Sequence, residues 1–329
     1  MEDLDYLFST AKIRTMETRL FSKQELIGLI NTEKYEEAIS KLTEKGWKDP
    51  DCSDYDAMEK TLSAERERVF NELVSFAPDK DLIRVFRLKY DYHNLKAILK
   101  ARALAKPCEE ILSPCGNIPQ SKMYMTMYDE TYTALSPIMK NAVLDAMDII
   151  SRTKDPFYSD MALDAACFYE MLQLAKHSGS EFLETYVKLK IDAVNICTAI
   201  RIKRRGLSYE YLKQAFIPGG SINKNKLLTD ITPDVIKSAL EKTALESVSE
   251  IAGSVLRGDE MLTSLDIAID NALMEYIRNA KYIGLGEQPL AAFAAAKEAE
   301  ITAVRIIFSG RLAGLSGKEI TERLRETYV

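Results

Sequence analysis

L-K-Y-D-Y-H-N-L, at Leu88–Leu95, is the stretch that decides the fold, because the chain repeats its pattern. The same pattern, L-K-x-D-x-x-N-[LI], returns 101 residues later at Leu189–Ile196. A weaker third copy lies 108 residues beyond the second, where Glu300 replaces the aspartate and Ala303 replaces the asparagine. A period of about a hundred residues in a chain of 329 predicts three copies of one unit.

The residues that follow each copy support this register. Gly206–Ser208 recurs as Gly314–Ser316 at the same offset of 108. In the second copy the cations of Arg201–Arg205 precede Gly206, and cations in a last turn followed by glycine are typical of a helix end. We therefore expect three similar helical units with boundaries near residues 125 and 230, namely 1–125, 126–230 and 231–329.

Helical periodicity runs through most of the chain. Apolar residues return every three or four positions in Tyr6–Trp47 and again in Ala57–Phe76. We expect the first core helix at about Asp81–Lys106, and long helices before the later cores at Leu163–His177 and Leu265–Tyr282. No run of alternating β-branched and polar residues predicts a strand, so the predicted fold class is all-α.

Composition excludes several classes of function. Apolar residues make up 47% and charged residues 29%, as in a soluble globular protein, and the net charge of −6 leaves no broad basic surface for nucleic acid. No apolar run is long enough for a transmembrane segment, and the acidic Met1–Asp5 is unlike a signal peptide. The five cysteines lack paired C-x-x-C spacing and are expected to be free cytosolic thiols.

The repeated polar pairs are candidate site residues. Positions three apart share a helix face, so Asp91 lies beside Asn94, and Asp192 beside Asn195. No histidine, cysteine or acidic cluster recurs with them, although a metal site would need such ligands. We therefore interpret these four residues and Glu300 as structural residues of the core helices, which hold a neighbouring loop or helix end by hydrogen bonds.

Motifs that bind ligands are incomplete elsewhere in the chain. Asp49–Lys60 resembles a calcium loop, but its sixth position is Asp54, where the turn needs glycine. Gly314–Lys318 resembles a phosphate loop, but Glu319 stands where a hydroxyl is required. Two histidines cannot build a multi-histidine metal site, and no G-x-S-x-G elbow is present. No catalytic residue, cofactor, metal or bound nucleotide is expected.

Two segments allow more than one interpretation. The basic run Arg201–Arg205 fits a helix terminus better than a phosphate-binding patch. The apolar segment Met123–Tyr128 fits a partner surface and a packed helix equally well, because methionine adapts to both.

Five short segments, in order along nearly the whole chain, carry a family resemblance. They are Tyr6–Arg14, Tyr90–Lys96, Ile191–Ile196, Phe216–Gly220 and Glu298–Val329. With them the sequence resembles the central-stalk subunit of V-type and archaeal-type rotary ATPases and ATP synthases, known as the C subunit in prokaryotes and the d subunit in eukaryotes. Its compact length is more similar to the prokaryotic branch.

The resemblance implies a funnel-shaped, all-α protein of three similar domains around a pseudo-threefold axis. It also implies a non-enzymatic rotor subunit, whose wide end receives the axle subunits of the central stalk and whose other face sits on the membrane proteolipid ring. Such a subunit transmits torque for proton or sodium transport and is peripheral on the cytoplasmic face of the cell membrane.

A general helical scaffold or adaptor unrelated to rotary ATPases is the alternative function. Ordinary helical solenoids have periods of roughly 20 to 50 residues, which disfavours it. A helical-domain enzyme is a third class, for which the sequence offers no motif.

Overall fold

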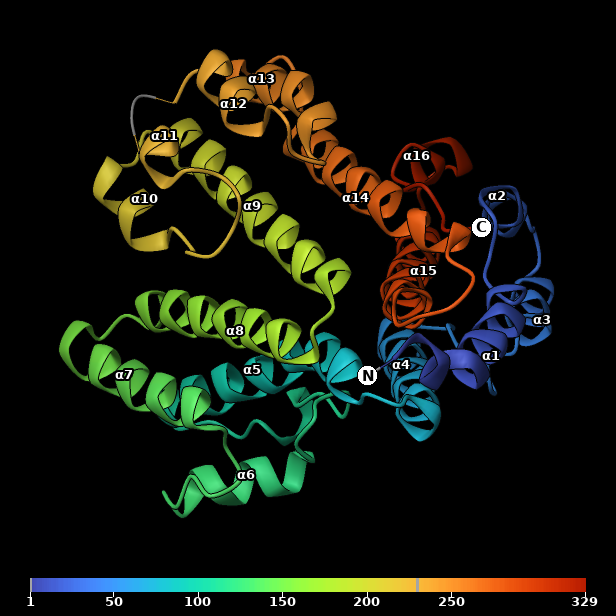
Figure 1. The fold of residues 1–329 in the computed structure, drawn as a ribbon, viewed down its shortest axis with the longest axis horizontal. Coiled ribbons are helices and arrows are strands. Elements are labelled where there is room, and N and C mark those ends of the chain that lie inside the picture. The colour runs from blue at the N-terminus through green and yellow to red at the C-terminus, as the bar shows by residue number, and fades with distance from the viewer. Residues whose placement is uncertain (1, 229–230) are drawn as a thin grey trace. The chain divides into compact units, whose positions relative to one another are not determined.

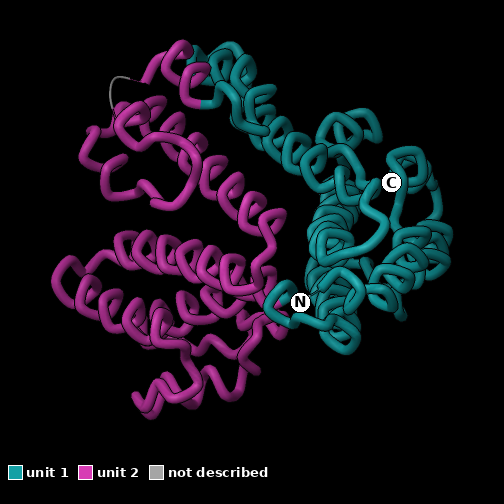
Figure 2. Tube along the Cα trace, in the orientation of Figure 1, with its two compact units in different colours: residues 1–83, 240–329 teal, residues 84–239 magenta. Residues whose placement is uncertain are grey.

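The predicted all-α class is confirmed by the computed structural model, which describes residues 2–228 and 231–329. These residues form helices and no strand (Figure 1). They divide into two compact units, unit 1 with residues 1–83 and 240–329, and unit 2 with residues 84–239 (Figure 2). The three units predicted from the repeat, their pseudo-threefold arrangement and the funnel shape stay predictions.

Unit 1 is built on α15 (Gln288–Leu312), which packs against α1 and α4. Seven consecutive residues of α15, Leu290–Ala296, are buried, and a helix that is apolar on all sides belongs inside a core. The other helices of the unit are η1 (Asp3–Tyr6), α1 (Leu7–Glu17), α2 (Lys23–Ile30), α3 (Tyr35–Glu44), α4 (Tyr55–Phe76), η3 (Glu246–Val248), α13 (Ser249–Arg257), α14 (Leu262–Arg278), η4 (Asn279–Tyr282) and α16 (Gly317–Thr321).

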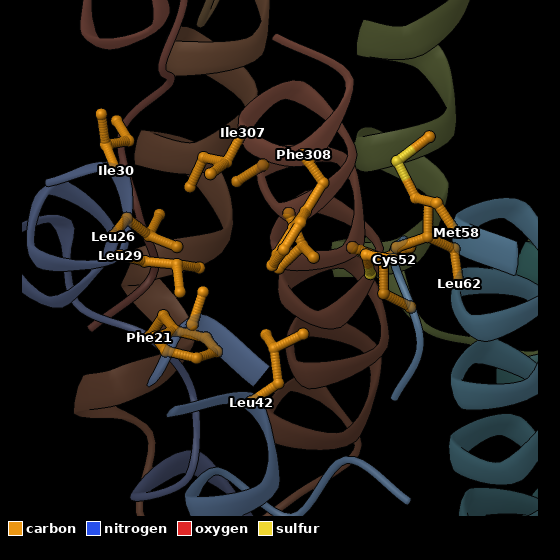
Figure 3. Close-up of a cluster of buried hydrophobic side chains, with 14 of the residues drawn as sticks. Phe21, Leu26, Leu29, Ile30, Leu42, Cys52, Met58, Leu62, Ile307 and Phe308 are labelled. Carbon is orange, nitrogen blue, oxygen red and sulfur yellow. The ribbon is translucent and has the colours of Figure 1, made fainter. Parts of the chain in front are cut away.

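The two ends of the chain share the hydrophobic core of unit 1. Leu26 and Leu29 of α2 are fully buried in one cluster with Ile307 and Phe308 of α15 (Figure 3). Burying a leucine side chain contributes about 1.5–3 kcal/mol. Residues from the first fifty of the chain are therefore held against its last third.

Unit 2 contains the first two copies of the repeat, on α5 (Asp81–Leu104) and α9 (Glu181–Arg204); α5 begins three residues before the unit. α8 (Pro156–Ser178) packs against α7 (Pro137–Thr153) and α9. The remaining helices are η2 (Glu109–Ile111), α6 (Gln120–Tyr128), α10 (Tyr209–Ala215), α11 (Lys224–Leu227) and α12 (Pro233–Leu240), whose last residue belongs to unit 1.

Polar side chains at successive turns join α5 to α8. Positions four apart share a helix face, so one stripe of α5 can supply several pairs. The pairs are Tyr92–Glu170 (2.8 Å), Lys96–Asp164 and Lys100–Asp160 (2.6 Å). The first is buried and fixes the register of the two helices.

Some predicted helix bounds agree with the structure and others differ. The helix expected at Asp81–Lys106 is α5, which ends two residues earlier. The helix expected from Leu163 is α8, which begins seven residues earlier, because Pro156 fits a first helical turn and Asp155 caps it. The stretch Leu265–Tyr282 divides into α14 and η4.

The predicted helix ends are confirmed. Gly206 and Gly314 follow α9 and α15 with φ of 65° and 72°, the left-handed conformation that glycine adopts without strain. Ser316 and Glu319 form a capping box at the start of α16.

Two predictions from composition concern the whole chain. Among the described residues no disulfide forms, and four of the five cysteines are buried. In the same part of the chain, no helix combines the length and apolarity needed to cross a bilayer.

Candidate functional site

The aspartate and asparagine of the second copy both bind the loop that follows α10. Asn195 Nδ2 donates to the carbonyl oxygen of Ile217 at 2.8 Å, and Ile217 N donates to Asn195 Oδ1 at 2.9 Å. The two carboxylate oxygens of Asp192 accept from Ser221 N at 2.9 Å and from Ile222 N at 3.0 Å. Both side chains are buried. The pair therefore pins the loop to the middle of α9.

The first copy repeats these contacts on α5. Asn94 Nδ2 donates to the carbonyl oxygen of Ser113 at 2.9 Å and its Oδ1 accepts from Ser113 N at 2.7 Å. Asp91 accepts from Asn117 N at 3.0 Å and from Ile118 N at 2.9 Å. Arg87, one turn before, donates to the carbonyl oxygen of Cys115 at 3.1 Å. We call each such set of contacts a loop lock.

The chemistry of a loop lock explains its residue types. A carboxylate only accepts hydrogen bonds, so aspartate suits two consecutive backbone N–H groups. A side-chain amide both donates and accepts, so asparagine suits the N–H and C=O of a single residue. Exchanging the two types would place like groups against each other and leave buried donors unpaired, at a cost of about 1–3 kcal/mol each.

A glycine faces the carboxylate in both loop locks. A Cβ added to Gly220 would overlap Oδ1 of Asp192, and a Cβ added to Gly116 would overlap Oδ1 of Asp91. Neither glycine has a positive φ. The requirement for glycine is therefore steric: the loop backbone passes too close to the core helix for any side chain.

The loop residues were not predicted as site residues, although the sequence carries a signal for them. Ser113–Ile118 and Ile217–Ile222 both have the pattern x-P-x-G-x-I, at a spacing of 104. In each loop the first residue contacts the asparagine, the glycine faces the aspartate, and the last residue donates to it. The core pattern recurs at 101, so the three additional residues lie between the core helix and the loop.

In the third copy the carboxylate binds the N-terminal part of the chain. Phe21 N donates to Glu300 Oε2 at 2.7 Å, and both residues are buried in unit 1. Ala303, in the place of the asparagine, lines a space of about 20 Å³ beside them, which is room for one water molecule.

The three carboxylates have one structural feature in common: each accepts from the residue that precedes a helix N-cap. Phe21 precedes Ser22, the N-cap of α2. Ile118 and Ile222 precede the N-caps of α6 and α11. A carboxylate near the start of a helix is also favoured by the helix dipole. The repeated contact is therefore between a core helix and the start of a later or earlier helix.

A buried ion cluster accompanies the third copy. Lys297 Nζ lies 2.7 Å from Glu300 Oε1 and 2.8 Å from Glu65 Oε1, and 5.0 Å above the ring of Trp47. Glu65 also pairs with Arg68 at 2.8 Å. Burial alone lowers the pKa of Lys297, but the two glutamates outweigh it and raise the pKa above its ordinary value. Lys297 is therefore charged at neutral pH.

These arrangements bind protein groups and leave little room for a ligand. Asp91, Asn94, Asp192 and Asn195 are at most 1% exposed, and their oxygens accept backbone N–H groups. Within the described residues, no three His, Cys, Asp or Glu side chains gather as a group that could hold a metal ion. That these residues and Glu300 have a structural role stays a prediction, and variants test it.

Asp192→Ala tests the structural role through stability. Burial raises the pKa of Asp192, although the N–H groups of Ile222 and Ser221 partly oppose this. We expect the variant to lose about 1–3 kcal/mol of unfolding free energy, measured by urea denaturation. A carboxyl with a raised folded pKa contributes most below the unfolded value of about 3.9 and less as pH rises through the folded value. The loss should therefore be larger in mild acid than at neutral pH.

Asp148→Ala is the matched control for this measurement. Asp148 lies on α7 in the same unit, and its side chain is 61% exposed in a surface pair with Arg152. Its removal should change stability by less than about 0.5 kcal/mol. Unchanged stability of Asp192→Ala together with lost assembly into a complex would contradict the structural role.

The segment Met123–Tyr128, which allowed two interpretations, has features of both. Met123 and Met127 of α6 are fully buried, whereas Met125 and Tyr128 of the same helix are 62% and 70% exposed. One face of this helix packs into unit 2 and the other is open to solvent.

Comparisons with known proteins match nearly the whole chain. The sequence model of the ATP synthase (C/AC39) subunit family matches residues 9–323. The C subunit of the V-type sodium ATPase of Enterococcus hirae is 24% identical over 322 residues, which are 96% of this chain and 97% of that protein. The C subunit of the A-type ATP synthase of Methanocaldococcus jannaschii is 24% identical over 97% of this chain and 86% of that protein. The C subunit of the A-type ATP synthase of Haloferax volcanii is 24% identical over 95% of this chain and 95% of that protein.

Proposed function

The chain belongs to the ATP synthase (C/AC39) subunit family, and from this premise we propose that it is the non-catalytic rotor subunit of a V/A-type ATPase or ATP synthase. In this role it links the axle subunits of the central stalk to the membrane proteolipid ring and transmits torque for proton or sodium transport. It lies on the cytoplasmic face of the cell membrane as part of the complex.

The observation that carries this proposal is the extent of the family match. It includes all three core helices, so the similarity is not confined to one module. By name, the relatives are the C subunits of a sodium ATPase and of ATP synthases. A general helical scaffold would not be expected to match such proteins over more than nine-tenths of its length.

The loop locks support a mechanical role. A protein that transmits torque must not let its helices slide under load. Each core helix is fixed near its middle to the start of another helix by a buried, fully paired carboxylate. Hydrogen bonds to charged groups contribute about 1.5–3 kcal/mol each, so slippage at these points is costly.

Three repeat units, 1–125, 126–230 and 231–329, belong to the same proposal. The three carboxylate contacts support it, since each repeat unit supplies one carboxylate. Phe21, which binds the carboxylate of the third repeat unit, lies in the first repeat unit. This contact therefore joins the first and third repeat units.

Omission of the chain from a reconstituted rotary complex tests the proposal. We expect ATP-driven ion pumping into vesicles to fall to background without it, while ATP hydrolysis by the catalytic subunits persists, because axle and ring are no longer coupled. The isolated chain should hydrolyse no ATP. Equal pumping with and without the chain would refute the rotor role. Co-purification from membranes, with axle and ring subunits identified, checks the partners directly.

A further inference from the structure

Positive charge is concentrated in one segment of unit 2. Arg201–Lys226 contains seven Lys or Arg residues and one acidic residue, Glu210, so the segment carries a net charge of +6 in a chain of net charge −6. It begins in the last turn of α9 and continues through α10 to α11. Four cations lie in Arg201–Arg205, all with exposed side chains.

An apolar pocket opens within the same segment. Its volume is about 540 Å³, and α10 lies beside the end of α9 at this point (Figure 1). Two large side chains at the pocket, Leu207 and Tyr209, are each 43% exposed. The lining residues are Ile202, Lys203, Leu207, Tyr209, Leu212, Leu228 and Ile231. Within residues 2–228 and 231–329, Lys203 is the one charged residue among those that line the pocket.

We propose that this surface, Arg201–Leu212 with the adjoining pocket, binds anionic phospholipid at a membrane surface. Exposed apolar side chains within a cluster of four to eight cations are the combination that holds a protein at an anionic bilayer interface. The cations attract lipid headgroups, and Leu207 and Tyr209 enter the boundary between headgroups and acyl chains. The open, apolar pocket has room for part of an acyl chain.

Lipid fits this surface better than an acidic protein segment does. Attraction to an anionic bilayer needs a cluster of cations beside exposed apolar side chains and no fixed pairing of each cation with one anionic group. Here the cations follow one another along the end of α9, and only one of them lines the pocket. This inference rests on the proposed function, which brings the chain beside a membrane, but the lipid contact is additional to the contact with the proteolipid ring.

Co-sedimentation of the full chain with vesicles tests the proposal. The probes are vesicles of phosphatidylcholine alone and of phosphatidylcholine with one quarter phosphatidylglycerol. We expect binding to the anionic vesicles only, weakened by added salt. Each cation near an anionic surface strengthens binding roughly fivefold, so Arg204→Gln/Arg205→Gln should bind roughly 25-fold more weakly. Leu207→Asn should weaken binding without changing its salt dependence.

Lys34→Gln/Lys318→Gln is the matched control, since it removes the same charge at side chains that are 74% and 87% exposed in unit 1. It should bind anionic vesicles within about twofold of the original chain. The proposal is overturned if the original chain does not bind anionic vesicles, or if the Arg204/Arg205 variant binds as well as the control.

Separate measurements distinguish this proposal from the rotor role. If the Arg204/Arg205 variant loses co-purification with rotary-complex subunits but retains vesicle binding, the surface contacts protein and the lipid proposal is wrong. If the original chain binds anionic vesicles but purifies with no such subunits, the rotor role fails and the lipid surface stands.

Discussion

Gly220→Ala is expected to lower the unfolding free energy by about 3 kcal/mol, although it adds one methyl group. The added Cβ would overlap Oδ1 of Asp192, so the loop or the carboxylate must move. Movement breaks the hydrogen bonds from Ser221 N and Ile222 N to a buried carboxylate. Each such bond contributes about 1.5–3 kcal/mol, and overpacking a tight site costs a similar amount. Urea denaturation followed by circular dichroism measures the loss.

Amide hydrogen exchange shows whether the loss has this cause. Exchange of the Ser221 and Ile222 amides should become faster in Gly220→Ala, because their acceptor has been displaced. Gly284→Ala is the control: its Cβ would have no neighbour within 4 Å and its φ is not positive, so little change is expected. If Gly220→Ala were as stable as Gly284→Ala and its two amides stayed protected, the close packing of loop and carboxylate would not matter to the fold.

The sequence predicts a structural role for the aspartate and asparagine because they recur together on one helix face. Their partners were harder to find. Asn94 binds a residue 19 positions later, whereas Asn195 binds one 22 positions later. Aligning the two copies at the 101-residue spacing of their core helices therefore misaligns their loops by three residues. Only the x-P-x-G-x-I pattern, compared separately, aligns Gly116 with Gly220.

The third copy could not be completed from local sequence. The replacement of the asparagine by Ala303 was visible in the sequence. Its partner, Phe21, lies 279 residues before Glu300, and nothing near Phe21 resembles the loops of the other copies. Periodicity and capping rules describe neighbours within one helix or turn, so contacts between distant segments need coordinates.

The helices themselves followed from the sequence because each depends on local chemistry. α8 was predicted too short, since Pro156 reads as a breaker unless it is recognised as a first-turn residue after the cap Asp155.

The ion cluster around Lys297 was not predicted at all. Glu65 and Lys297 lie on different long helices, and a buried lysine is rare enough that an exposed position is the ordinary expectation.

Lys297→Met is expected to lower the unfolding free energy of unit 1 by about 3 kcal/mol. Removing one member of a buried ion pair typically costs about 3–5 kcal/mol, because the remaining charge is uncompensated. The lower end applies here, since Glu300 keeps its bond from Phe21 N and Glu65 keeps Arg68. Methionine preserves most of the side-chain length, so a large cavity does not form.

Trp47 makes the measurement specific to unit 1. It is the only tryptophan of the chain and lies under the Lys297 ammonium, so its fluorescence reports unfolding where the substitution is made. Lys34→Met, at a 74% exposed side chain, should change stability by less than about 0.5 kcal/mol.

In the double variant Lys297→Met/Glu300→Gln the two losses of unfolding free energy should not add, because the second change neutralises a carboxylate left without its cation. Additive losses would show that Lys297 acts through packing alone, and that the charge of Glu300 has no part in holding the N-terminal segment.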